Sequence, residues 1–323
     1  MLDFLDKINV ISESDYPATM TNEVEPYLAK RRKDDCFLSA DGKQIHYEAY
    51  DKLLSRGSIV ILHGFTESAE KFREVAYYFR KAGYGVFTLD LRGHGKSHRD
   101  SDNPLRVDIG TFDTYADDLN TFIEEIVKPA IGNKDICIYS HSLGSTVALL
   151  YMMKHPYTIK KAVLSSPMIC GNMGMPVAVA GTVAKLLCKA GGKTIPAPGR
   201  CVFDENQTFD NSDATSRARF EYYHQKRKSE ALYQTSGPSF SWVKASLEAR
   251  DKIMAEDNIR KLSADMLIFK PETDKQLLGE WTDRFAEMAD VKIKNVKSSR
   301  HEIFMSGDET LKWYMEEILE FFA

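Results

Sequence analysis

Several features that mark other classes of protein are missing from this chain of 323 residues. The five cysteines are an odd number and show no C-x-x-C spacing, which argues against a disulfide framework or a metal site. The formal net charge is only −4, from 43 basic and 47 acidic residues, so no nucleic-acid partner is expected. No hydrophobic run is long enough to span a bilayer, and residues 1–6 carry acids where a signal peptide carries basic residues. We therefore expect a cytoplasmic protein with no metal and no cofactor.

Apolar runs of strand length alternate with helical patterns over most of the chain. The runs with strand character lie at 36–40, 44–50, 58–62, 85–90, 136–139, 162–165, 266–269 and 291–296. Helical patterns lie at 72–82, 111–127, 146–153, 277–288 and 309–322. The Asp41-Gly42 pair predicts a hairpin between the first two strands. The alternation predicts an α/β fold with a mostly parallel sheet and helices on both faces.

This alternation stops between residues 167 and 262. The stretch shows no buried-strand pattern and is far longer than an ordinary connection within an α/β unit. Its composition is helical, which predicts an inserted helical cap at 167–262. We expect the core to comprise residues 34–166 and 263–323, preceded by a polar N-terminal extension at 1–33.

A candidate nucleophile lies where one predicted strand meets one predicted helix. Ser142 follows the strand at 136–139, and the small residues Ser140 and Gly144 flank it two positions away on each side. Small residues at these positions are typical of a nucleophile elbow, a sharp turn that exposes the serine hydroxyl. The usual pattern is G-x-S-x-G, and Ser140 here replaces the first glycine.

A serine hydroxyl needs a neighbouring base, and that base needs an orienting acid. His301 follows the strand at 291–296, on a loop at the sheet edge where ligand sites form, and it is our candidate base. Asp274 follows the strand at 266–269 and is the first choice for the acid, with Glu272 as the alternative. These residues keep the chain order serine, acid, histidine that α/β-hydrolases show.

The loop His63-Gly64-Phe65 follows another predicted strand. The backbone N–H groups of Phe65 and Leu143 are our candidates for an oxyanion hole. Gly64 is expected to let the backbone approach the substrate closely. His63 is expected near the substrate, with a role in holding the loop favoured over a catalytic one.

Together these motifs resemble the α/β-hydrolase group of bacterial lysophospholipases and monoacylglycerol lipases. The resemblance is carried by His63-Gly64, the segment Asp-Leu-Arg-Gly-His-Gly-Lys-Ser at 90–97, the elbow, and His301-Glu302-Ile303, with further similarity at 237–243. It implies an α/β-hydrolase fold, with Ser142, Asp274 and His301 at the triad positions and Phe65 and Leu143 at the oxyanion positions. The residues Lys-Pro-Glu-Thr at 270–273 are an unusual approach to the acid.

The expected reaction is the hydrolysis of carboxylic esters of single-chain lipids, lysophospholipid or monoacylglycerol, through an acyl-enzyme. A serine at the elbow excludes the dehalogenase and epoxide-hydrolase branches, which need an aspartate there. One alternative is a carboxylesterase for small or aromatic esters. The other is a hydrolase fold without activity that serves as a binding protein.

The predicted cap carries one apolar set and one basic set of residues. The apolar set is expected either to line an acyl-chain tunnel, with Met168, Met173 and Met175 contacting substrate, or to pack the cap onto the core; it comprises Met168, Met173, Met175, Val177, Val179, Leu186 and Leu187. The basic set is expected to form a solvated helix face, with a phosphate headgroup or the inner face of a membrane as the alternative contact; it comprises Arg217, Arg219, Lys226, Arg227 and Lys228.

Overall fold

A computed structural model describes residues 9–50, 56–198 and 202–323 of the chain. Its centre is an eight-stranded sheet in the order β1-β2-β4-β3-β6-β7-β9-β10. These strands are β1 (Lys33–Leu38), β2 (Gln44–Tyr50), β3 (Ser58–Leu62), β4 (Gly85–Leu89), β6 (Ile136–His141), β7 (Lys161–Ser165), β9 (Asp265–Pro271) and β10 (Lys292–Val296). Only β2 runs antiparallel to its neighbours in this sheet, so the prediction of a mostly parallel sheet is confirmed.

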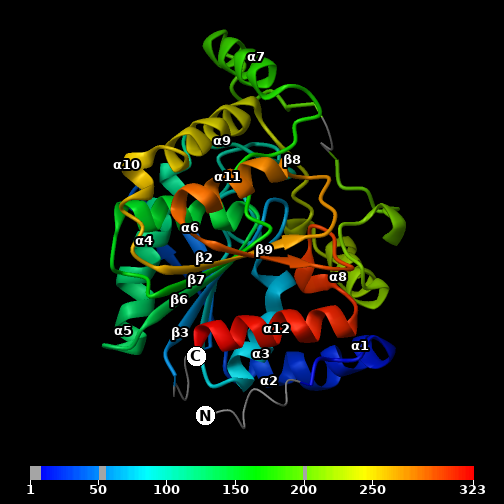
Figure 1. Cartoon of the computed structure of the whole chain (residues 1–323). Helices are drawn as coiled ribbons and strands as arrows, with labels where there is room; N and C mark the ends of the chain where they lie inside the picture. Colours follow the sequence, from blue (N-terminus) through cyan, green and yellow to red (C-terminus); the bar gives the residue numbers. More distant parts are fainter. Residues whose placement is uncertain (1–8, 51–55, 199–201) are drawn as a thin grey trace.

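Helices cover both faces of the sheet, as predicted (Figure 1). One face is covered by α4 (Asp113–Phe122), α5 (Lys128–Ile131), α6 (Leu143–Lys154), α9 (Phe240–Ile253), α10 (Glu256–Ile259) and α11 (Gly279–Ala289). The other is covered by α1 (Tyr16–Thr19), α2 (Glu25–Ala29), α3 (Arg73–Lys81) and α12 (Asp308–Phe322). Short 3-10 or π segments are η2 (Glu13–Asp15), η3 (Met20–Val24), η4 (Ala69–Phe72), η5 (Ile123–Val127), η6 (Phe209–Asn211), η7 (Ala231–Tyr233) and η8 (Ile303–Met305). None of the described helices combines the length and hydropathy that a membrane span requires.

The central strands have the composition that a doubly covered sheet demands. All five residues of β3 are buried, because β4 and β6 flank this strand and helices cover both of its faces. At the sheet edge, β1 begins and ends two to three residues earlier than predicted and is exposed along most of its length. The hairpin turn at Asp41-Gly42 is confirmed, with Gly42 at a φ of +75°.

Part of the N-terminal segment that the sequence suggested to be polar is buried, within the described residues 9–33. Tyr16, Met20, Val24 and Leu28 recur every four residues and are all buried. This spacing places them on one helical face, which packs on α3 and joins the core on that side of the sheet. The sequence contained this periodicity, but Pro17, Pro26 and the many polar residues around it obscured the pattern.

Between β7 and β9 the described residues form α7 (Val177–Lys189), α8 (Arg217–Ser229), α9 and α10, which agrees with the predicted helical character. The short strand β8 (Gly237–Pro238) pairs with β5 (Arg106–Val107). α9 packs on α6, so its apolar face belongs to the core, whereas α7 packs on the outer side of α9 and stands farthest from the sheet (Figure 1). The limits of the cap as a separate domain stay a prediction.

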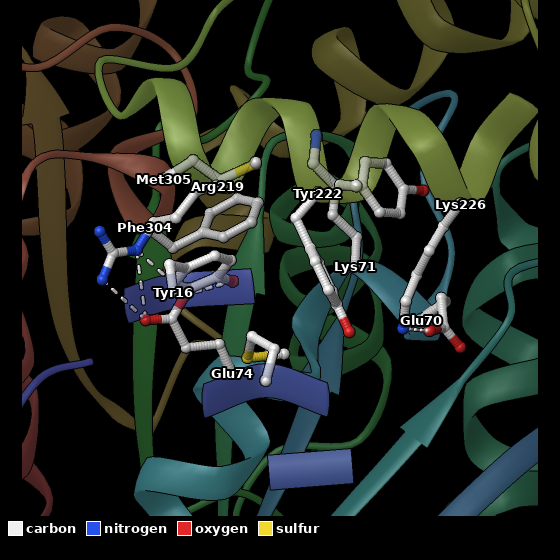
Figure 2. Close-up of a pocket in the computed structure, with 11 residues that line it drawn as sticks. Tyr16, Glu70, Lys71, Glu74, Arg219, Tyr222, Lys226, Phe304 and Met305 are labelled. Atoms are coloured by element: carbon white, nitrogen blue, oxygen red, sulfur yellow. Dashed lines mark hydrogen bonds and ion pairs between the residues drawn. The ribbon is translucent and has the colours of Figure 1, made fainter. Parts of the chain in front are cut away.

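The prediction of a solvated basic face on α8 is wrong for Arg219. Its side chain is fully buried, and its Nη2 and Nε atoms lie 3.0 and 3.1 Å from the two carboxylate oxygens of Glu74 on α3. Nη2 also donates to the carbonyl oxygen of Ile11 at 2.7 Å, and Nη1 pairs with Asp308 on α12 at 3.1 Å. Figure 2 shows Arg219 and Glu74, with Tyr16 beside them, around a cavity of about 20 Å³ that has room for about one water molecule. Arg219 therefore ties α8 to α3, to α12 and to the N-terminal segment.

Replacing Arg219 with methionine should lower the free energy of unfolding by about 3–5 kcal/mol, because Glu74 would be left buried without its cation. Urea denaturation measures this change. Arg217→Met is the matched control on the same helix: Arg217 is exposed and its acidic partners Asp210 and Glu221 are exposed as well, so a change within about 0.5 kcal/mol is expected. Equal effects of the two substitutions would contradict a structural role for the buried cluster.

Candidate active site

Ser142 lies in the sharp turn between β6 and α6. Its φ of +50° and ψ of −115° form a strained conformation for a residue with a side chain. The turn presses against β3, where a Cβ on Gly144 would lie 2.3 Å from the carbonyl oxygen of Leu62. Ser140 is buried as well, and its hydroxyl donates to the carbonyl oxygen of Val163 at 3.1 Å. The turn therefore demands the small residues that the sequence shows around Ser142.

The loops after β9 and β10 bring an acid and a histidine together. Nδ1 of His301 and Oδ2 of Asp274 lie 2.8 Å apart, and both side chains are largely buried. The other oxygen of Asp274 accepts from the backbone N–H groups of Gln276 and Leu277, which fixes the carboxylate. Glu272 is exposed and accepts from the backbone N–H of Ser298 at 2.7 Å, so it is committed elsewhere on the loop.

The pKa values of the pair follow from this contact. Burial alone would lower the pKa of His301, but the hydrogen bond and negative charge of Asp274 raise it above its ordinary value. Burial alone would raise the pKa of Asp274, but the hydrogen bond and charge of His301 lower it. The pair can thus keep a charged carboxylate behind an imidazole that accepts a proton more readily than a free histidine.

His63 holds the loop after β3 in place, as the sequence favoured. His63 is buried; its Nδ1 lies 2.8 Å from the carbonyl oxygen of Gly64, and its Nε2 accepts from the N–H of Leu91 at 2.8 Å. Both ring nitrogens are engaged in these contacts. A Cβ on Gly64 would lie 2.7 Å from Oε2 of Glu67 and 3.2 Å from Cβ of Ser142, so glycine is needed here for close packing on the elbow. Neither residue is among the described residues that line the cavity over Ser142, and a role of either in binding substrate stays a prediction.

The two candidate oxyanion donors flank Ser142. Phe65 follows Gly64 and lines the cavity, where its ring packs on Trp242 at a centroid distance of 4.5 Å. Leu143 is the first residue of α6, a position at which a backbone N–H has no partner within the helix. The start of a helix also favours developing negative charge.

A cavity of about 590 Å³ lies over the elbow, and Ser142, His301 and Phe65 all line it. Met168, Met173 and Met175 line it as well, together with apolar residues of α7 and α9. Two other residues of the apolar set, Val179 and Leu186, are exposed and are not among the described residues that line the cavity. The volume lies within the usual range for sites that hold small molecules.

One cluster elsewhere has the residue types of a metal site. Asp34, His46 and Glu48 place potential ligand atoms within 4.8 Å of one another, and this is the group of that kind found in the described parts of the chain. His46 already bridges Asp34 and Asp90 through its two ring nitrogens, and Glu48 pairs with Arg32 and Arg73. These contacts explain the cluster as part of a structural ion-pair network.

The family model described as serine aminopeptidase, S33, matches residues 54–308. The chain belongs to this family. Lysophospholipase L2 of Escherichia coli is 24% identical over 306 residues, which cover 90% of this chain and 88% of that protein. Monoacylglycerol lipase of Mycolicibacterium smegmatis is 30% identical over 169 residues, which cover 50% and 56% of the two chains. Among solved structures, a soluble variant of monoglyceride lipase from Saccharomyces cerevisiae superposes with a TM-score of 0.69 at 19% identity, covering 90% and 93% of the two chains. The α/β-hydrolase fold that the motifs implied is thereby confirmed.

In this member of the family, a buried network that no sequence motif marks links the segments that carry Gly64, Ser142 and His301. Oε2 of Glu67 accepts from the N–H of Gly64 at 2.6 Å and lies 3.0 Å from Nδ1 of His141. Nε2 of His141 lies 3.2 Å from the carbonyl oxygen of His301, and Lys71 pairs with both Glu67 and Glu302. One carboxylate thus connects the loop after β3, the elbow and the His301 loop. Burial opposes ionisation of Glu67, but Lys71 and His141 hold its pKa well below its usual range.

Replacing Glu67 with glutamine should lower kcat about 10- to 100-fold with little change in KM, because misaligned catalytic groups lose rate before they lose substrate binding. Steady-state kinetics with a soluble ester measures this split. Glu302→Gln is the comparison: it weakens the pair with Lys71 but keeps the contacts of Glu67 with Gly64 and His141, so a smaller loss is expected. Wild-type kcat in the Glu67 variant would show that the network does not position the site.

Proposed function

We propose that this protein is a serine hydrolase that cleaves carboxylic esters of single-chain lipids, lysophospholipids or monoacylglycerols. The observation that carries the proposal is the 2.8 Å contact of Asp274 with His301, a histidine that lines the same cavity as the strained Ser142. The relatives named lysophospholipase and monoacylglycerol lipase support the substrate class. The apolar lining of the cavity supports it independently, since an acyl chain needs an apolar wall.

In the proposed mechanism, Oγ of Ser142 attacks the ester carbonyl carbon while Nε2 of His301 takes the hydroxyl proton. Asp274 keeps the other ring nitrogen protonated and stabilises the imidazolium that forms. The N–H groups of Phe65 and Leu143 would stabilise the oxyanion, a contribution of about 3 kcal/mol for one donor. His301 then protonates the leaving alcohol, and a water molecule activated by the same imidazole releases the fatty acid from Ser142.

A hydrolysis panel tests the proposal. Monoolein, oleoyl lysophosphatidylcholine, p-nitrophenyl esters of increasing chain length and an aminoacyl p-nitroanilide would be offered to the wild-type protein and to an inactive variant. We expect activity to rise with acyl length beyond butyrate and the anilide to remain intact. A sharp fall beyond butyrate would favour a carboxylesterase for small esters. No turnover, with no labelling by a fluorophosphonate, would favour a binding protein without activity.

We also propose that α7 contacts a lipid surface. Val179, Val183 and Leu186 are exposed at positions i, i+4 and i+7, and thus form one apolar stripe on the outermost helix. Val183 and the exposed Met175 also line the catalytic cavity, so the stripe continues to the place where an acyl chain would enter. Lys185, Lys189 and Lys193 are exposed beside it and would favour anionic lipid.

Replacing Leu186 with glutamate should lower binding to vesicles about tenfold, because the stripe would lose apolar area and gain a charge that anionic lipid repels. Co-sedimentation with vesicles of phosphatidylglycerol and phosphatidylcholine measures the effect. The control is Leu232→Glu, which changes an exposed leucine outside α7. Hydrolysis of a soluble short-chain ester should stay unchanged in both variants, and equal vesicle binding by both would contradict the docking of α7.

A further inference from the structure

One member of the basic set on α8 faces the catalytic cavity. Arg227 lines the same cavity as Ser142 and His301. Its Nε donates to the carbonyl oxygen of Tyr233 at 3.0 Å and its Nη2 to that of Thr235 at 3.2 Å, while the guanidinium lies 4.6 Å from the centre of the Phe203 ring. These contacts use two of its five N–H donors and fix the direction of the group. The guanidinium is therefore held in place with donors to spare.

Arg227 is paired differently from three other basic side chains of this region, each of which has an acidic partner. Arg219 pairs with Glu74, Lys226 with Glu25 and Glu70, and Lys71 with Glu67 and Glu302. Within the described ranges 9–50, 56–198 and 202–323, no acidic side chain forms an ion pair with Arg227; its partners there are neutral carbonyl groups and an aromatic ring. A half-buried cation on a cavity wall without an acid beside it favours an anionic ligand.

The position of Arg227 suits the headgroup of a lipid rather than its chain. α7 and α9 contribute mainly apolar residues to the cavity, whereas α8 and its neighbouring loops contribute polar and charged ones. Tyr223, on the same face of α8, packs on Nζ of Lys71 at 5.1 Å, and Lys71 pairs with Glu302 next to His301. Arg227 follows four residues later, which is about 6 Å along the helix from Tyr223. A lipid whose ester carbonyl lies at Ser142 would therefore share one cavity with the guanidinium of Arg227.

We propose that Arg227 binds the phosphodiester of a single-chain phospholipid and thereby makes such lipids better substrates than monoacylglycerols. This proposal rests on the proposed ester hydrolase function and adds the headgroup class and the residue that recognises it. A guanidinium presents paired N–H donors that match two phosphate oxygens, whereas the free glycerol hydroxyls of a monoacylglycerol carry no charge to pair with it.

The experiment compares kcat/KM for oleoyl lysophosphatidylglycerol, monoolein and a p-nitrophenyl ester, with the wild-type protein and Arg227→Gln. Loss of the charge-assisted hydrogen bonds should lower kcat/KM for the phospholipid about 10- to 100-fold. The values for monoolein and the nitrophenyl ester should change little, and Arg227→Lys should recover part of the phospholipid activity. The matched control is Lys228→Gln, which removes the same charge from the next, exposed residue of α8. All three substrates should be hydrolysed normally by that variant.

Arg227 also holds the carbonyl groups of Tyr233 and Thr235, so the nitrophenyl ester reports damage to that segment. A parallel loss on all three substrates would reduce Arg227 to a structural role and overturn the proposal. If Arg227→Gln hydrolyses both lipids at wild-type rates but loses an inhibition by inorganic phosphate that the wild-type protein shows, Arg227 binds a free anion and the proposal is overturned. If the wild-type protein hydrolyses none of the three, the proposed function itself fails. If kcat/KM of Arg227→Gln falls for the phospholipid alone, the result supports both the hydrolase function and the role of Arg227.

Discussion

Replacing Ser142 with alanine is expected to lower kcat/KM for ester substrates by about 10⁴- to 10⁶-fold. Without the hydroxyl, no acyl-enzyme can form, and only binding and oxyanion stabilisation remain. The fold should survive, since alanine fits wherever serine does and Ser142 holds the elbow through its backbone contacts with Ser165 and Met168. Initial rates on a p-nitrophenyl ester, with circular dichroism as the check on folding, measure the effect.

Ser140→Gly is the control for the elbow. It removes a hydroxyl two residues away and restores the glycine of the usual motif, so most of the activity should remain. Labelling by a fluorophosphonate probe should disappear in Ser142→Ala and persist in Ser140→Gly. Persistent hydrolysis and labelling in the alanine variant would assign catalysis to another residue.

Replacing Asp274 with asparagine should lower kcat by about 10⁴-fold, because the amide cannot hold the tautomer of His301 that accepts the proton from Ser142. The matched control is Glu272→Gln, which changes an exposed acid of the same loop that contacts Ser298 and not His301. Glu272→Gln should retain nearly full activity. The opposite ranking would assign the acid to Glu272, the alternative that the sequence left open.

The pH profile provides a second readout for the same pair. His301 must be neutral to act as a base, so kcat/KM should rise with pH through its pKa. Asp274 raises that pKa above its ordinary value of 6.5, so the rise should be centred above that pH in the wild-type protein. In Asp274→Asn the negative charge is lost, burial then dominates, and the rise should move to lower pH. An unchanged midpoint would show that another group controls the profile.

The predictions for Ser142 and Asp274 concern residues that lie far apart in the sequence but share one edge of the sheet. Parallel strands place their carboxyl ends at a common edge, and β6, β9 and β10 deliver Ser142, Asp274 and His301 there. The network of Glu67 adds the loop after β3 to the same edge. Changes to the side chains that make these contacts should therefore lower kcat, whereas changes on α7 or at Arg227 should act on membrane binding and headgroup preference.

The sequence alone determined those features that depend on local patterns and on topology. The apolar runs of β3, β4 and β6 predicted buried strands, and Asp41-Gly42 predicted the hairpin, because solvent exposure and turn geometry act over a few residues. The elbow motif, the chain order and the position of each residue just after a predicted strand were enough to single out Ser142, Asp274 and His301 as candidates.

Only the tertiary structure decided which partner each polar side chain meets. Arg219, Lys226 and Arg227 look alike in the sequence, yet one is buried against Glu74, one pairs with Glu25 and Glu70, and one faces the catalytic cavity. Likewise, Glu67 belongs to no motif of the sequence, yet its carboxylate contacts Gly64 and His141, and His141 contacts the His301 loop. The physical reason is that the cost of burying a charge depends on groups brought from distant parts of the chain, and sequence spacing does not encode those meetings.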